Sequence, residues 1–211
     1  VYTSTNPYPL CGSSVEPLGP TSQTLEIASG WDMISTYMMP DNPSVDAVLA
    51  DISDNIIIVK DYLGTAYLPE WNFNGIGNIT IGQGYQIKTT MNSSLTISGD
   101  YLFPEQNPLY IGESWNMIGY LRTSPALVDL VLADLVAADN LIIAKNSLGS
   151  AFLPEWDFNG IGNFEPGKGY QLKTNSADTL YYLSNDESYG TNKMASTFSL
   201  NSSVSYFEKI P

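Results

Sequence analysis

The segment Leu63–Asn78 reads LGTAYLPEWNFNGIGN, and the later segment Leu148–Asn163 reads LGSAFLPEWDFNGIGN. Thirteen of the sixteen positions are identical, and the other three exchange Thr for Ser, Tyr for Phe and Asn for Asp. Self-similarity at a fixed spacing is the signature of a duplicated structural unit. The repeat therefore predicts an architecture of two similar modules. It also favours a display or binding function over catalysis in a single cleft.

The repeat extends outward from this segment over most of the chain. Further equivalent stretches are Trp31–Ile34 with Trp115–Ile118, Val45–Ile52 with Val128–Leu135, Asn55–Lys60 with Asn140–Lys145, and Gly84–Thr89 with Gly169–Thr174. We define residues 22–103 as the first repeat and residues 104–187 as the second repeat. An extended N-terminal strap at residues 1–21 and a C-terminal strap or extra strand at residues 188–211 complete the predicted organisation.

Periodicity within each repeat predicts its secondary structure. Val45, Val48, Leu49 and Ile52 recur at the spacing of one face of a short amphipathic helix. The apolar runs 56–59 and 141–144 predict buried strands, the alternating stretch 85–89 a half-solvated strand, and the Gly/Asn-rich segment a long loop. We therefore expect an α+β fold of two tandem pseudo-symmetric modules. Each would be mainly antiparallel sheet with one short helix, and each would close its own small hydrophobic interior.

The charge balance limits the classes of partner. The chain has 211 residues and a formal net charge of -14, with 8 Lys plus Arg against 22 Asp plus Glu. Such a surface repels phosphate groups, which argues against nucleic acid and anionic membranes as partners. No apolar stretch approaches the roughly 18 residues of a membrane span, so we expect no membrane insertion. The scarcity of Lys and the many Asn, Ser, Thr and Tyr residues are typical of a secreted or cell-surface protein.

The residue types needed for common catalytic sites are largely missing. The chain has no His, which excludes Ser-His-Asp and Cys-His nucleophiles and His-ligated zinc. Glu70 and Glu155 are the obvious carboxylate pair for glycoside hydrolysis, but they occupy equivalent positions of separate repeats and should lie far apart. Cys11 is the single cysteine, so no internal disulfide can form. We predict a protein that is not an enzyme and has no catalytic residues.

Calcium is the one cofactor that the sequence leaves open. Acidic residues that could supply hard oxygen ligands from loops are Asp41, Asp51, Asp54, Asp61, Asp134 and Asp139. None of them follows the spacing of a helix-loop-helix calcium loop, and solvated acidic loops are the alternative interpretation. We therefore predict no metal-binding residues.

The duplicated loop supplies the candidate ligand-binding residues. They are Glu70, Trp71 and Asn74 in the first repeat and Glu155, Trp156 and Asn159 in the second. In one interpretation the indole face stacks on a sugar ring while Glu and Asn bind its hydroxyl groups. In the other the segment is a shaped loop, with Ile76 in the core and Trp71 packed over the helix. Trp31 and Trp115 open apolar strands, and we expect both to be core anchors.

The Trp31–Ile34 opening and the Gly82–Lys88 stretch, with their repeats, resemble tandem extracellular modules of secreted and cell-surface proteins of Bacteroidota. Those modules carry the pattern GWN-(L/M)-I-S … PGKGY-x-hydrophobic-K, and similar modules could be borrowed by phages of such bacteria. The second repeat keeps Pro166–Tyr170 intact, whereas the first has IGQGY there and Asp32 in place of the usual Asn. The resemblance covers about residues 22–183 and implies tandem use at a surface, in adhesion, spacing or substrate attachment.

These observations favour a non-enzymatic extracellular structural or adhesive module that mediates attachment or protein–protein assembly. Two alternatives stay open: a carbohydrate-binding module that uses the Trp, Glu and Asn loops, and a subunit of a phage virion appendage or surface filament. The expected partners are other protein subunits or surface glycans.

Overall fold

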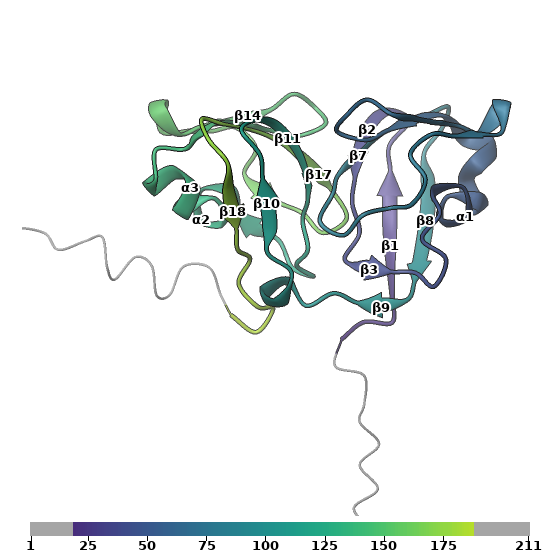
Figure 1. The fold of residues 1–211 in the computed structure, drawn as a ribbon, viewed down its shortest axis with the longest axis horizontal. Coiled ribbons are helices and arrows are strands. Elements are labelled where there is room, and N and C mark those ends of the chain that lie inside the picture. The colour runs from purple at the N-terminus through teal and green to yellow at the C-terminus, as the bar shows by residue number, and fades with distance from the viewer. Residues whose placement is uncertain (1–18, 188–211) are drawn as a thin grey trace, which may run out of the picture.

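The structure, a computed structural model, describes residues 19–187 and consists mostly of antiparallel sheet with a few short helices (Figure 1). The two repeats form two lobes that lie side by side. Most of the predicted N-terminal strap with Cys11, and the whole predicted C-terminal strap, lie outside the described residues.

The first repeat is built on a five-stranded antiparallel sheet. Its elements are β1 (Ser22–Ile27), β2 (Gly30–Ile34), β3 (Met38–Met39), α1 (Val45–Val48), the 3-10 helix η1 (Ala50–Asn55), β4 (Ile56–Lys60), β5 (Ala66–Leu68), η2 (Pro69–Trp71), β6 (Phe73–Asn74), β7 (Tyr85–Thr89), β8 (Ser93–Ser98) and β9 (Asp100–Tyr101). The sheet has the order β2-β7-β4-β5-β6, while β1 pairs with β8 and β3 with β9. The strands of the sheet bury alternate residues, because successive side chains point to opposite faces.

The second repeat contains a five-stranded sheet with the corresponding order, β11-β17-β13-β14-β15. Its elements are η3 (Pro104–Gln106), β10 (Leu109–Ile111), β11 (Ser114–Gly119), β12 (Ala126–Leu127), α2 (Val128–Val131), α3 (Ala133–Ala137), β13 (Leu141–Lys145), β14 (Ala151–Leu153), η4 (Pro154–Trp156), β15 (Phe158–Asn159), β16 (Asn163–Phe164), β17 (Gly169–Thr174) and β18 (Asp178–Leu180). Here β10 pairs with β18, as β1 does with β8, and β12 pairs with β16.

The core lies between each five-stranded sheet, its two-stranded ribbon and its helices. The helices lie on the outer flanks of the lobes, and the ribbons β1–β8 and β10–β18 lie below the larger sheets (Figure 1). Helix residues Val45 and Leu49 are buried against Leu25 and other apolar side chains. The buried apolar side chains of both repeats form one connected cluster, where we expected two separate interiors.

Three local features differ from the sequence-based expectation. The predicted long loop contains β5, η2 and β6, because its Tyr-containing segment pairs with β4 and its Phe-containing segment pairs with β5 in a meander. The single predicted helix is α1 followed by η1 in the first repeat and two short helices, α2 and α3, in the second. The predicted buried strands are only half buried, since a β-bulge leaves Ile57 and Ile142 exposed.

The two repeats meet through a reciprocal set of backbone hydrogen bonds. The Ser35 N–H donates to the Gly167 carbonyl at 2.9 Å, and the Gly119 N–H donates to the Gly82 carbonyl at 2.8 Å. Ser35 and Gly119 are equivalent positions, as are Gly82 and Gly167. Each repeat therefore offers the other a donor and an acceptor from equivalent sequence positions.

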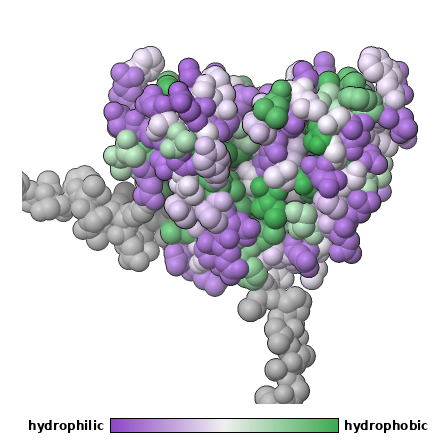
Figure 2. Space-filling view, viewed as in Figure 1, coloured by the Kyte–Doolittle hydropathy of each residue, from purple (hydrophilic) through white to green (hydrophobic). Residues whose placement is uncertain are grey.

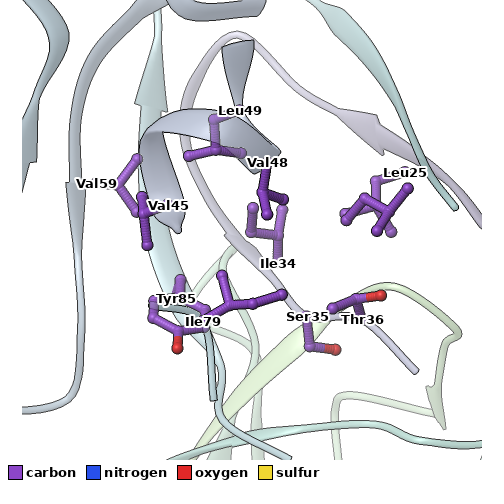
Figure 3. A pocket seen from close by; sticks show the side chains of 11 residues that line it. Leu25, Ile34, Ser35, Thr36, Val45, Val48, Leu49, Val59, Ile79 and Tyr85 are labelled. Carbon is purple, nitrogen blue, oxygen red and sulfur yellow. The ribbon is translucent and has the colours of Figure 1, made fainter. Parts of the chain in front are cut away.

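The interiors of the two repeats are filled differently. In the second repeat Phe164 stacks on Tyr170 at 3.8 Å between ring centroids, and Tyr120 contacts both Phe164 and Tyr182 edge-on. The position equivalent to Phe164 is Ile79. Ile79 lines a small apolar cavity of about 30 Å³ beneath α1, together with Val48 and other residues of the first repeat (Figure 3).

Candidate functional site

The duplicated loops lie at opposite ends of the molecule. Strands β6 and β15 form the outer edges of their sheets, whereas β2 and β11 lie where the repeats meet. The turns η2 and η4 therefore project at the two far corners of the molecule (Figure 1). The six predicted site residues form two separate groups of three, and the carboxylates Glu70 and Glu155 do not share one cleft.

The two loop tryptophans are largely exposed to solvent. Trp71 is 72% exposed and Trp156 is 71% exposed, so neither packs over a helix as the structural interpretation required. Ile76, by contrast, is half-buried against the core, as that interpretation expected. Each turn ends on a residue with a left-handed backbone, Asn72 or Asp157, and that conformation returns the chain to the sheet edge.

The asparagine side chains of the loops hold the backbone. The Asn74 amide donates to the Gly77 carbonyl at 3.0 Å, and its oxygen accepts from the Gly77 N–H at 2.8 Å. It also donates to the Asp46 carboxylate at 2.8 Å. Asn159 makes the same two bonds to Gly162. These asparagines stabilise the loop, and the Glu and Trp of each triplet are exposed and have, within residues 19–187, no hydrogen bond that fixes the loop.

A second surface, which the sequence did not reveal, contains the other two tryptophans. Trp31 is 46% exposed and Trp115 is 47% exposed, so the expectation that they are core anchors is wrong. In the strand register Trp31 lies opposite Lys88 and Trp115 lies opposite Lys173. Both tryptophans therefore lie on the face of the sheet that points away from the helices.

Each tryptophan has two lysine ammonium groups near its ring. The Nζ atoms of Lys60 and Lys88 lie 5.5 and 5.6 Å from the ring centroid of Trp31. The Nζ atoms of Lys145 and Lys173 lie 5.2 and 5.9 Å from that of Trp115. These distances are within the range of a cation–π interaction. In the described part of the chain none of these four lysines forms an ion pair with a carboxylate.

We call the side chains on this side of each five-stranded sheet the outer face. By strand register it comprises Trp31, Met33, Ile58, Lys60, Ala66, Leu68, Phe73, Gln86 and Lys88 in the first repeat, and Trp115, Met117, Ile143, Lys145, Ala151, Leu153, Phe158, Gln171 and Lys173 in the second. All nine pairs of equivalent residues are identical, and none is acidic.

The buried side of the same strands has changed between the repeats. The pairs that differ there are Asp32 and Asn116, Ile56 and Leu141, Val59 and Ala144, Tyr67 and Phe152, and Ile87 and Leu172. Core positions are constrained by packing, and solvent-facing positions of a sheet ordinarily accept many residues. Identity is thus complete on the outer face and partial on the buried side, where Ile34, Tyr85 and Thr89 also match their equivalents in the second repeat.

A cavity lies where the two outer faces approach each other. It has a volume of about 210 Å³ and is lined from the first repeat by Trp31, Asp32, Met33 and Gln86, and from the second by Lys145, Asn146, Ser147, Gly149 and Gln171. The space-filling view shows a notch between the lobes on the side where the five-stranded sheets lie (Figure 2). The cavity combines one indole, one ammonium group, several amide and hydroxyl groups, and the Asp32 carboxylate, which is ion-paired with Lys168.

The remaining candidates for chemistry give no assembled site. Within residues 19–187 no three carboxylate, Cys or His side chains come close enough together to hold a metal ion. Asp61, one of the acidic loop residues, accepts hydrogen bonds from the Leu63 and Thr65 N–H groups and thereby shapes its turn. In the same range no helix is both long and apolar enough to span a bilayer.

Comparison with known proteins adds no relative to this picture. No protein-family model matches the chain, and no curated protein or solved structure is found to be similar to it.

Proposed function

We propose that this chain is a non-enzymatic extracellular attachment module that contacts its partner through the outer faces of its two sheets. The observation that carries the proposal is the identity of all nine outer-face pairs, Trp31 and Trp115 among them, beside an interior side that is identical only in part. Half-exposed tryptophan is the side chain best suited to anchor a contact, since it buries a large rigid area at low entropic cost. The sheets hold these side chains on a rigid frame.

The proposal includes two pseudo-symmetric modules related by an approximate two-fold axis at their interface. Its support is the matching strand order of the two sheets and the reciprocal bonds between Ser35 and Gly167 and between Gly119 and Gly82. Two equivalent faces on one rigid body allow a repetitive partner to be held at two points. Such bivalent contact raises the overall affinity without any new type of interaction.

An adhesion assay tests this function. Beads coated with the 211-residue chain are washed over surfaces that carry neutral polysaccharides, anionic polysaccharides or extracellular matrix proteins. We expect retention on at least one surface and at least a tenfold loss of retention in the Trp31→Ala/Trp115→Ala variant. The matched control is Trp71→Ala/Trp156→Ala, which removes two exposed tryptophans outside the outer faces and should retain adhesion.

Retention on none of the surfaces would contradict the attachment function. Equal loss in both double variants would show that the outer faces are not the contact surface. Loss of retention in the Trp71→Ala/Trp156→Ala control alone would favour the second candidate function, a carbohydrate-binding module that uses the duplicated loops. That candidate is supported by the high exposure of Trp71 and Trp156, each beside an exposed glutamate.

A further inference from the structure

We infer that the ligand of the outer faces is an anionic polysaccharide, a chain of carboxylated or sulfated sugars, and that one sugar unit occupies the cavity beside Trp31. The inference rests on the proposed attachment function and specifies its partner. It follows from the charge, the shape and the hydrogen-bonding groups of the surface.

The charge of the outer faces is opposite to that of the chain as a whole. The chain has a net charge of -14, yet its outer faces contain four lysines and no acidic residue. The chain has 22 carboxylates, so the absence of any acidic residue from the outer faces is not explained by a shortage of Asp and Glu. These four ammonium groups, which have no carboxylate partner among residues 19–187, attract an anion to the outer faces, whereas the acidic remainder of the surface repels it.

The aromatic groups identify the rest of the ligand as a ring with an apolar face. The indole of Trp31 forms one wall of the cavity, and the ammonium groups of Lys60 and Lys88 lie within 5.6 Å of its centroid. A pyranose ring can stack its C–H face on an indole while a carboxylate or sulfate at its edge reaches a neighbouring ammonium group. A Trp flanked by lysines meets both requirements of a sugar acid.

Four other lining residues match the hydroxyl groups of such a sugar, and the charge of the Asp32 carboxylate in the lining is offset by its ion pair with Lys168. Gln86 and Gln171 face the cavity from the two repeats, and Asn146 and Ser147 add an amide and a hydroxyl. These groups both donate and accept hydrogen bonds, as a sugar hydroxyl does. At about 210 Å³ the cavity is smaller than the roughly 300–1,000 Å³ of sites for drug-sized ligands, which suits a single unit of a longer chain.

An acidic peptide is the competing ligand class, and the surface favours the glycan. Peptides that bind to sheets usually add a strand to a free edge and place alternate side chains in apolar pockets. The outer faces present side chains, not backbone edges, and the cavity is lined mainly by polar groups around Trp31. Recognition here therefore depends on stacking and on hydroxyl hydrogen bonds.

Titration calorimetry with the full chain tests the inference. The probes are polygalacturonate (carboxylated), dextran sulfate (sulfated), unmodified dextran (neutral) and polyglutamate (acidic peptide). We expect binding of both anionic glycans, weakening as salt increases, and no binding of dextran. The Lys88→Gln/Lys173→Gln variant should lower the affinity at least tenfold. The charge-matched control Lys193→Gln/Lys209→Gln, which lies outside the described residues, should stay within twofold.

The stacking contact needs its own variants. Trp31→Ala should lower the affinity at least tenfold, Trp31→Phe should restore most of it, and circular dichroism should show an unchanged fold for both. Polyglutamate bound as tightly as the glycans, with the same dependence on Trp31, would overturn the assignment to a glycan. Equal affinity for dextran would overturn the requirement for charge.

The two proposals fail in different ways. If the coated beads adhere through the outer faces but no anionic glycan binds, the attachment function stands and the ligand class is wrong. If neither adhesion nor glycan binding depends on the outer faces, both proposals are wrong.

Discussion

The Nζ atom of Lys168 lies 2.8 Å from the Oδ2 atom of Asp32 and joins the second repeat to strand β2 of the first. The equivalent positions are Gln83 and Asn116, so the interface between the repeats has an ion pair on one side and neutral residues on the other. Asp32 is 3% exposed. Its burial raises the pKa of the carboxyl, but the bond from Lys168, the Ala28 and Met33 N–H groups and the Lys168 charge together hold that pKa below its ordinary value.

Loss of this ion pair should destabilise the chain. We expect Lys168→Gln to lower the free energy of unfolding by about 1–3 kcal/mol, since it leaves the buried Asp32 carboxylate without its charged partner. The double variant Asp32→Asn/Lys168→Gln recreates the neutral residues of the other side and should recover part of the loss. Urea unfolding of the four proteins in this double-mutant cycle measures the coupling. A coupling near zero would contradict a stabilising role for the pair.

The same pair predicts a dependence of stability on pH. The pKa of Asp32 is lower in the folded chain than in the unfolded chain. The stability it contributes is therefore present above the ordinary carboxyl pKa and is lost as the pH falls through the folded value. Wild-type stability should fall more steeply below about pH 4 than that of Asp32→Asn/Lys168→Gln. Parallel acid titrations followed by circular dichroism should show this difference, and identical profiles would count against it.

The close approach of the repeats at Gly84 should tolerate no side chain. A Cβ atom built there lies 2.6 Å from the Ile118 carbonyl oxygen, which is too close for any real contact. We expect Gly84→Ala to lower the unfolding free energy by about 1–3 kcal/mol, because backbone must shift at the interface. Gly112→Ala is the control, since its nearest neighbour would be 3.5 Å away. Equal melting temperatures for the two variants would rule out a tight interface at Gly84.

The cavity beneath α1 should accept a larger side chain. Ile79→Phe places in the first repeat the ring that Phe164 provides in the second. Filling a cavity of about 30 Å³ should raise the unfolding free energy by about 0.7 kcal/mol, at roughly 24 cal/mol per Å³. Phe164→Ile, the reverse exchange, should destabilise the chain. Chemical denaturation measures both, and a destabilised Ile79→Phe would indicate that the cavity has the wrong shape for a ring.

Two variants in the duplicated loop of the first repeat should differ in their effect on stability. Trp71→Ala should change the unfolding free energy by less than about 0.5 kcal/mol, because the indole is 72% exposed. Asn74→Ala should cost about 1–2 kcal/mol, since it removes the bonds to Gly77 and Asp46. Thermal unfolding compares the two. A lower melting temperature for Trp71→Ala than for Asn74→Ala would show that the indole stabilises the fold.

Much of the architecture could be predicted from the sequence because periodicity and repetition are local properties. The amphipathic helix residues Val45 and Leu49 are buried, and the half-solvated strand 85–89 alternates as expected. Strands β5 and β6 were missed because each has only two or three residues and forms through pairing, β5 with β4 and β6 with β5, which no local pattern records. The bulge at Ile57 was missed for the same reason.

The candidate surface could not be predicted, because it depends on register between distant strands. Trp31 opens an apolar strand, and a pattern within that strand does not tell which of its two faces the helices cover. Lys60 and Lys88 come from two other strands, and only the pairing of β2, β7 and β4 brings them beside Trp31. A usable signal was present in the repeat itself, since none of the sheet positions that differ between the repeats lies on the outer face.

The exchanged bonds between Ser35 and Gly167 and between Gly119 and Gly82 have a consequence for assembly. These four backbone groups already bond to each other within one molecule, so this contact needs no second chain. Identical chains cannot stack end to end through that contact unless the halves first separate. Any higher-order array must therefore grow from other surfaces of the molecule.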